Sequence, residues 1–60
     1  MIYTFTTRAG LNYKIEFIRE DDHNITGRVI NGRKSFVGKV LAFAKNNMLD
    51  LKITENAARH

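Results

Sequence analysis

The chain contains no cysteine and no proline. Without cysteine it can form no disulfide, and zinc sites that use Cys₄ or Cys₂His₂ ligand sets are excluded. Without proline it has neither a rigid polyproline linker nor a proline-rich ligand segment. A chain of 60 residues buries a small core. The domain therefore has to fold on that core alone, or on a core extended by a second copy.

Long apolar runs are also missing. No stretch approaches the roughly 18 residues that a membrane-spanning helix needs. The segment Met1 to Phe5 lacks the basic and then apolar pattern of a secretory signal. We therefore expect a cytoplasmic protein, and we read Asn24, which begins a glycosylation sequon, as a turn residue.

Negative charge is scarce and unevenly placed. The formal net charge is +4, and four of the six acidic residues lie between Glu16 and Asp22. No acidic residue occurs from His23 to Leu49. A basic segment of this kind predicts an anionic partner, either nucleic acid or an acidic protein surface. The basic residues of the segment are Arg28, Arg33, Lys34, Lys39 and Lys45.

Three strands are predicted in the first half of the chain. Residues Ile2 to Thr7 and Leu11 to Arg19 alternate apolar and polar side chains, and the connection around Gly10 predicts a hairpin. The polar residues 21–24 predict a turn, and a third strand follows from Ile25 to Ile30.

The second half predicts a helix followed by a last strand. From Phe36 onward the apolar residues cover one helical face, with Ser35 as N-cap and Lys45 in the last turn. Alternation from Leu49 to Thr54 predicts the last strand. A competing interpretation makes Asn31-Gly32 a hairpin turn before a strand at 33–37.

This order, β-β-β-α-β, predicts an α+β fold: an antiparallel meander with one helix packed on one sheet face, in a single domain of residues 1–54 with a flexible tail at 55–60. The last strand would lie beside the first and parallel to it, after a right-handed crossover. The outer sheet face would carry Thr4, Thr6, Lys14, Glu16, Arg28 and Lys52, with Ile2, Ile18 and Ile30. The predicted core is Tyr3, Phe5, Tyr13, Ile15, Phe17, Val29, Phe36, Val40, Leu41, Ala44, Leu51 and Ile53.

Two segments have the composition of a chemical site. Residues 27–35 approach the phosphate-loop pattern, but an inserted arginine moves Lys34 out of register, and the chain is too short for a nucleotide-hydrolysing domain. A weaker hypothesis places a phosphate or carboxylate at the helix start, on Gly32 to Ser35. Asp21, Asp22 and His23 are adjacent turn residues, which favours a polar turn over a metal site or an acid–base pair.

We therefore expect no enzyme, no metal and no cofactor. The predicted binding residues are Arg28, Arg33, Lys34, Ser35, Lys39 and Lys45. The first hypothesis is a protein-binding regulator or inhibitor that occludes a surface of a larger, nucleic-acid-handling complex. By size and element order it is similar to small phage and mobile-element proteins, which would place it in a host cytoplasm. The alternatives are a nucleic-acid-binding module that contacts phosphates, and a small structural subunit or homodimer.

Overall fold

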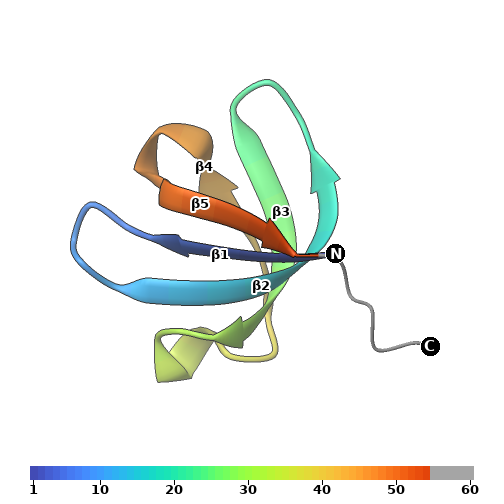
Figure 1. Ribbon diagram of the computed structural model, residues 1–60. Helices are drawn as coiled ribbons and strands as arrows, with labels where there is room; N and C mark the ends of the chain where they lie inside the picture. The colour runs from blue at the N-terminus through green and yellow to red at the C-terminus, as the bar shows by residue number, and fades with distance from the viewer. Residues whose placement is uncertain (55–60) are drawn as a thin grey trace.

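The computed structural model describes residues 1–54, and the predicted tail at 55–60 lies outside them (Figure 1). Every strand belongs to one five-stranded sheet, and two 3₁₀ turns are the only helical elements in this range. No helix among these residues is long and apolar enough to cross a membrane. The elements are β1 (Ile2–Thr6), β2 (Asn12–Glu20), β3 (Asn24–Asn31), η1 (Lys34–Phe36), β4 (Val40–Ala44), η2 (Lys45–Asn47) and β5 (Leu49–Thr54).

The predicted α+β class is wrong, because the segment expected to form the helix is strand β4 with a 3₁₀ turn at each side. Within β4, Leu41 and Phe43 are half-buried, whereas Val40, Ala42 and Ala44 are exposed. That alternation has the period of a strand. Before β4, Gly38 has a φ of 87°, which lies outside the helical range and breaks any continuous helix from Phe36.

The sheet order is β4-β3-β2-β1-β5, with every neighbouring pair antiparallel. The expectation that the last strand lies beside the first is confirmed, but its direction is antiparallel instead of parallel. Because β1 to β4 alternate in direction, β4 and β5 run the same way relative to the sheet. The turn η2 therefore carries the chain from one edge of the sheet to the other without reversing it.

This connection requires the sheet to curl. Four strand spacings in a flat sheet would separate the outer strands by about 19 Å. The five steps from Ala44 to Leu49 span roughly 10 Å, since a 3₁₀ turn rises about 2 Å per residue. The two edges therefore approach each other at η2, as Figure 1 shows. Arg8, in the connection between β1 and β2, holds η2 in place. Its backbone N–H donates to Asn47 Oδ1 (2.9 Å) and its Nε donates to the Asn46 carbonyl (3.0 Å).

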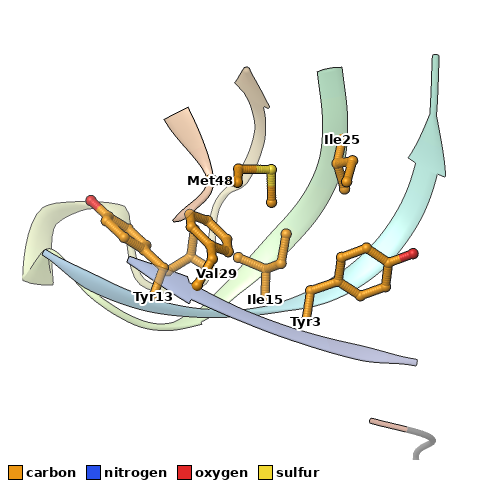
Figure 2. Close-up of a cluster of buried hydrophobic side chains, with 7 residues drawn as sticks. Tyr3, Tyr13, Ile15, Ile25, Val29 and Met48 are labelled. Atoms are coloured by element: carbon orange, nitrogen blue, oxygen red, sulfur yellow. The ribbon is translucent and has the colours of Figure 1, made fainter. Parts of the chain in front are cut away.

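The core lies inside the curl, where side chains from both halves of the sheet converge on Ile15 and Val29 (Figure 2). Aromatic rings from neighbouring strands stack around them. Tyr3 lies 5.1 Å from Phe17, and Phe5 lies 5.6 Å from Tyr13, between ring centroids. Phe43 of β4 packs against the second pair, at 5.2 and 5.3 Å from its two rings. This contact joins β4 to β1 and β2 across the interior.

Part of the predicted core is wrong. Val40, Ala44, Leu51 and Ile53 are exposed, and Phe17, Phe36 and Leu41 are half-buried at the margin. The helix would have turned Val40 and Ala44 inward, but in a strand they share the outer side with Ala42. In their place the core uses two residues that were not predicted, Ile25 at the start of β3 and Met48 between η2 and β5.

The predicted outer face is confirmed for the first three strands. Thr4 of β1 lies between Lys14 of β2 and Lys52 of β5, and Glu16 lies opposite Arg28. Gly27 lies where β3 comes close to β2. A Cβ atom at this position would lie 2.7 Å from the Glu16 carbonyl oxygen, so the two strands could not lie so close together with any larger residue.

Replacing Ile15 with alanine should destabilise the domain far more than the same change at Ile30. Ile15 is fully buried and Ile30 is exposed. A buried Ile→Ala change costs about 2–5 kcal/mol, which is most of the stability that a core of this size supplies. Urea unfolding followed by circular dichroism should find Ile15→Ala largely unfolded in buffer and Ile30→Ala within about 0.5 kcal/mol of wild type. Equal losses at the two positions would contradict this account of the core.

Candidate functional site

The predicted anion site at residues 32–35 loses its structural basis. Lys34, Ser35 and Phe36 form a three-residue 3₁₀ turn, and no side-chain hydrogen bond caps its start at Arg33. A single turn has neither the row of free N–H groups nor the macrodipole of an α-helix. The Arg33 guanidinium lies over the Phe36 ring, 5.5 Å from its centroid. The helix start that the phosphate hypothesis requires is therefore absent from this segment.

Arg28 is exposed on β3, and its side chain contacts the loop that leads into β4. Its Nη1 donates a hydrogen bond to the Gly38 carbonyl (3.1 Å). The backbone closes the same corner, because the Gly38 N–H donates to the Val29 carbonyl and the Val29 N–H donates to the Lys39 carbonyl (2.8 and 2.9 Å). In the strand register Arg28 lies opposite Val40. The guanidinium is thus held beside the first residue of β4.

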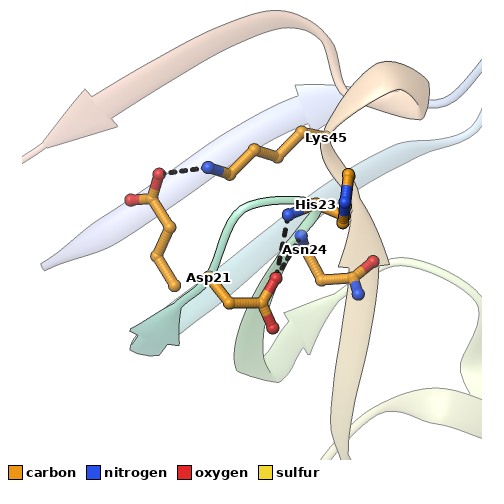
Figure 3. Close-up of polar contacts among 5 residues, drawn as sticks. Asp21, His23, Asn24 and Lys45 are labelled. Carbon is orange, nitrogen blue, oxygen red and sulfur yellow. Dashed lines mark hydrogen bonds and ion pairs between the residues drawn. The ribbon is translucent and has the colours of Figure 1, made fainter.

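Lys39 and Lys45 lie at the two ends of β4, about 20 Å apart along an extended strand. Lys39 directly precedes the strand and is exposed. Lys45 directly follows it, and its Nζ forms an ion pair of 2.6 Å with Glu20 Oε2 (Figure 3). Both side chains of this pair are partly exposed, so the pair contributes little to stability.

The six predicted binding residues therefore divide into two groups. Arg33, Lys34 and Ser35 lie in the loop between β3 and β4, whereas Arg28, Lys39 and Lys45 surround β4. The structure does not bring all six together. The second group matters because its members surround strand β4.

That strand is an open, uncharged sheet edge. In the sheet, β4 pairs with β3 on one side and with no strand on the other. Its sequence from Val40 to Ala44 is Val-Leu-Ala-Phe-Ala, without a charge or a proline. Proteins commonly protect an exposed edge with lysine, proline or a bulge, because a bare edge can pair with another chain. We call Val40–Ala44 the β4 edge. Sequence reasoning missed it because the segment was assigned to a helix.

The acidic turn at residues 21–24 is structural, as the sequence predicts. Asp21 Oδ1 accepts hydrogen bonds from the N–H groups of His23 (2.9 Å) and Asn24 (2.8 Å), as Figure 3 shows. The Asp21 N–H also donates to the Asn24 carbonyl. The two hydrogen bonds, from His23 first and then from Asn24, lower the pKa of the Asp21 carboxyl below its ordinary value of 3.8. They bind the carboxylate to its own backbone, as in an Asx turn.

A polar trough lies on the outer face of the sheet. Its cavity measures about 280 Å³. Lys14 and Lys52 lie on either side of Thr4 in the strand register, and Asp50 lies on the same wall as Lys52. The trough can attract an anion through its two lysines, although the carboxylate of Asp50 offsets part of that attraction.

No group of three or more metal-ligating side chains occurs within residues 1–54. No protein-family model, curated protein or solved structure gives a match to the chain.

The Asp21 turn should make stability depend on acid pH. The carboxyl has a folded pKa below its unfolded value, so its contribution is present above about pH 4 and is lost as the pH falls through the folded pKa. In Asp21→Asn the side-chain oxygen is kept and the charge is removed. Urea unfolding from pH 7 to pH 2 should find this variant less stable than wild type near neutrality, with the difference vanishing in acid. A difference that is constant across this range would contradict the proposed origin.

Proposed function

We propose that this protein is a non-enzymatic, protein-binding regulator whose β4 edge receives an extended segment of its partner. The observation that carries the proposal is the bare edge: five consecutive residues without charge or proline, on a strand that has a single neighbour in the sheet. In this mode of recognition an extended peptide adds a strand, and main-chain hydrogen bonds supply the affinity.

The charges around the β4 edge favour an acidic partner segment. Lys39 precedes the strand, and Arg28 lies beside Val40 in the register. Lys45 follows the strand, where its partner Glu20 already neutralises it. Acidic residues near the end that pairs with Val40 would gain attraction from Lys39 and Arg28, which mainly raises the association rate and fixes the direction of the added strand.

The β4 edge supports action by occlusion, in which binding itself covers a surface of the partner. Residues 1–54 hold no cluster of metal-ligating groups. The carboxyl of Asp21, whose pKa is lowered, is engaged in its own turn. A small domain that binds a strand covers the surface from which that strand comes. We therefore retain the hypothesis of a regulator or inhibitor that occludes part of a larger complex. The analogy with phage proteins no longer includes element order, because the predicted order was wrong.

Placing a lysine in the β4 edge should abolish partner capture. Val40→Lys puts a charge where the added strand would pair, and such a charge is one of the devices by which natural edges prevent pairing. The test uses immobilised wild-type and variant protein, a lysate of the organism that encodes the chain, and quantitative mass spectrometry. We expect a stoichiometric partner with wild type and at least a tenfold reduction with Val40→Lys.

Ile18→Lys is the matched control. Val40 is 47% exposed and Ile18 is 46% exposed, and both belong to strands, but Ile18 lies on β2, away from the β4 edge. This variant should capture the partner as wild type does. Equal loss with both variants, or equal capture by both, would rule out the β4 edge as the binding surface.

The trough supports a second candidate, a nucleic-acid-binding module that contacts phosphates. Lys14 and Lys52 flank Thr4 across three neighbouring strands, so two cations project from one face. Phosphate contacts of this kind give binding that weakens steeply with salt and carries no sequence preference. No aromatic residue is fully exposed in residues 1–54, so stacking on bases has no platform there.

Binding to a fluorescent single-stranded and a duplex oligonucleotide at low and moderate salt tests this candidate. If the trough binds phosphates, Lys14→Glu combined with Lys52→Glu should abolish the salt-dependent binding. Arg33→Glu combined with Lys34→Glu makes the same charge change in the loop before β4 and should leave most of it. Loss with the loop variant alone would assign the phosphates to the loop, and undetectable binding of wild type at low salt would eliminate the candidate.

A further inference from the structure

The other edge of the sheet, β5, differs from β4 in being self-complementary. It pairs with β1 on one side and with no strand on the other. All six of its residues are exposed, including Leu49, Leu51 and Ile53, of which Ile53 is 55% exposed. Three large apolar side chains on one short strand are more than a chance scatter of surface residues.

The charges of β5 are placed symmetrically about Leu51. Asp50 precedes Leu51 and Lys52 follows it, and both side chains line the trough on the outer face. No ion pair joins Asp50 or Lys52 to another described residue. If a second copy pairs its β5 antiparallel about a two-fold axis at Leu51, Asp50 of each chain lies opposite Lys52 of the other. The same register places Leu49 opposite Ile53, so that like meets like on the apolar side.

We infer that β5 is a homodimer interface, in which two copies form a continuous ten-stranded sheet across a two-fold axis. The pairing uses one patch on both copies, as two-fold symmetry requires. It forms two cross-strand ion pairs and covers the apolar residues of both strands. It is separate from the β4 edge, so it goes beyond the proposed function.

A stable dimer sets a minimum contact area for this pairing. Stable interfaces bury at least about 600 Å² per partner, and the accessible surface of the chain is 4205 Å². About one-seventh of that surface would have to be covered. Beyond β5 itself, the opening between β5 and the β2–β3 turn adds contact area: Leu51 and Ile53 line it together with Tyr3 and Met48, around a cavity of about 200 Å³.

The bulge at Asp50 is compatible with the pairing. The register of β5 against β1 shifts between Thr4 and Thr6, and Asp50 has a φ of 57°. Aspartate tolerates this conformation better than most residues. Regular pairing with β1 runs from Lys52 to Thr54, whereas Asp50 and Leu51 together lie opposite Phe5, so the two-fold axis falls at the bulge. Asp50 and Lys52 still lie on one side of the strand, because both line the trough.

Sedimentation equilibrium between about 10 μM and 1 mM tests the inference. Wild type should change from the 6.9 kDa monomer to twice that mass as concentration rises. Lys52→Asp places two aspartates opposite each other at both ends of the pairing and should weaken the dimer at least tenfold. Asp50→Lys places lysines opposite each other and should do the same.

The decisive measurement mixes these two variants. In the mixed dimer every aspartate of one chain faces a lysine of the other, so association should return although each variant alone stays monomeric. Thermal unfolding checks that both variants fold. If Asp50→Lys does not fold because of the positive φ at this position, Leu51→Lys replaces it and should abolish the wild-type dimer. A wild type that is monomeric at 1 mM, or a dimer whose affinity is unchanged by Lys52→Asp, overturns the inference.

Discussion

A single sheet of this size has one apolar face and no second layer to cover it, and the rest of the structure depends on how that face is buried. The sheet curls until β4 on one side packs against β1 and β2 on the other, through Phe43 and the Phe5–Tyr13 pair. Gly27 allows β3 to lie close against β2, and η2 joins the two edges at one corner. Ile15, at the centre of the curl, is shielded from both sides.

The same curl determines what remains outside. Because the interior accepts few side chains, apolar residues of the outer strands stay at the surface. The two edge strands, β4 and β5, differ in the charges that they carry. The β4 edge carries no charge, which makes it tolerant of many partner sequences but open to unwanted pairing. On β5, Asp50 and Lys52 restrict pairing to strands with the complementary order of charges. One small sheet thus presents one permissive edge and one selective edge.

The sequence predicted the local features well and the long-range ones poorly. Strands β1 to β3 and the Asp21 turn follow from alternation and turn chemistry, which are short-range signals. For β4 the apolar spacing fitted a helical stripe as well as a strand, and the deciding fact, the contact of Phe43 with Tyr13, is tertiary. Met48 lies between η2 and β5, outside every alternating segment, so strand periodicity does not mark it as a core residue. The basic site was predicted by composition, and the structure divides it because Arg33, Lys34 and Ser35 lie in the loop before β4, whereas Arg28, Lys39 and Lys45 surround that strand.

The pairing of β5 with β1 has a consequence for how the chain folds. Strands β1 to β4 are each joined to the next in sequence and can assemble by successive short hairpins, on a microsecond scale for each step. The contact of Ile2 with Thr54, by contrast, closes a loop of nearly the whole described chain. Its closure entropy is the largest in the molecule, so β5 should dock last and detach first. The slowest step in forming this domain is therefore the arrival of its final strand.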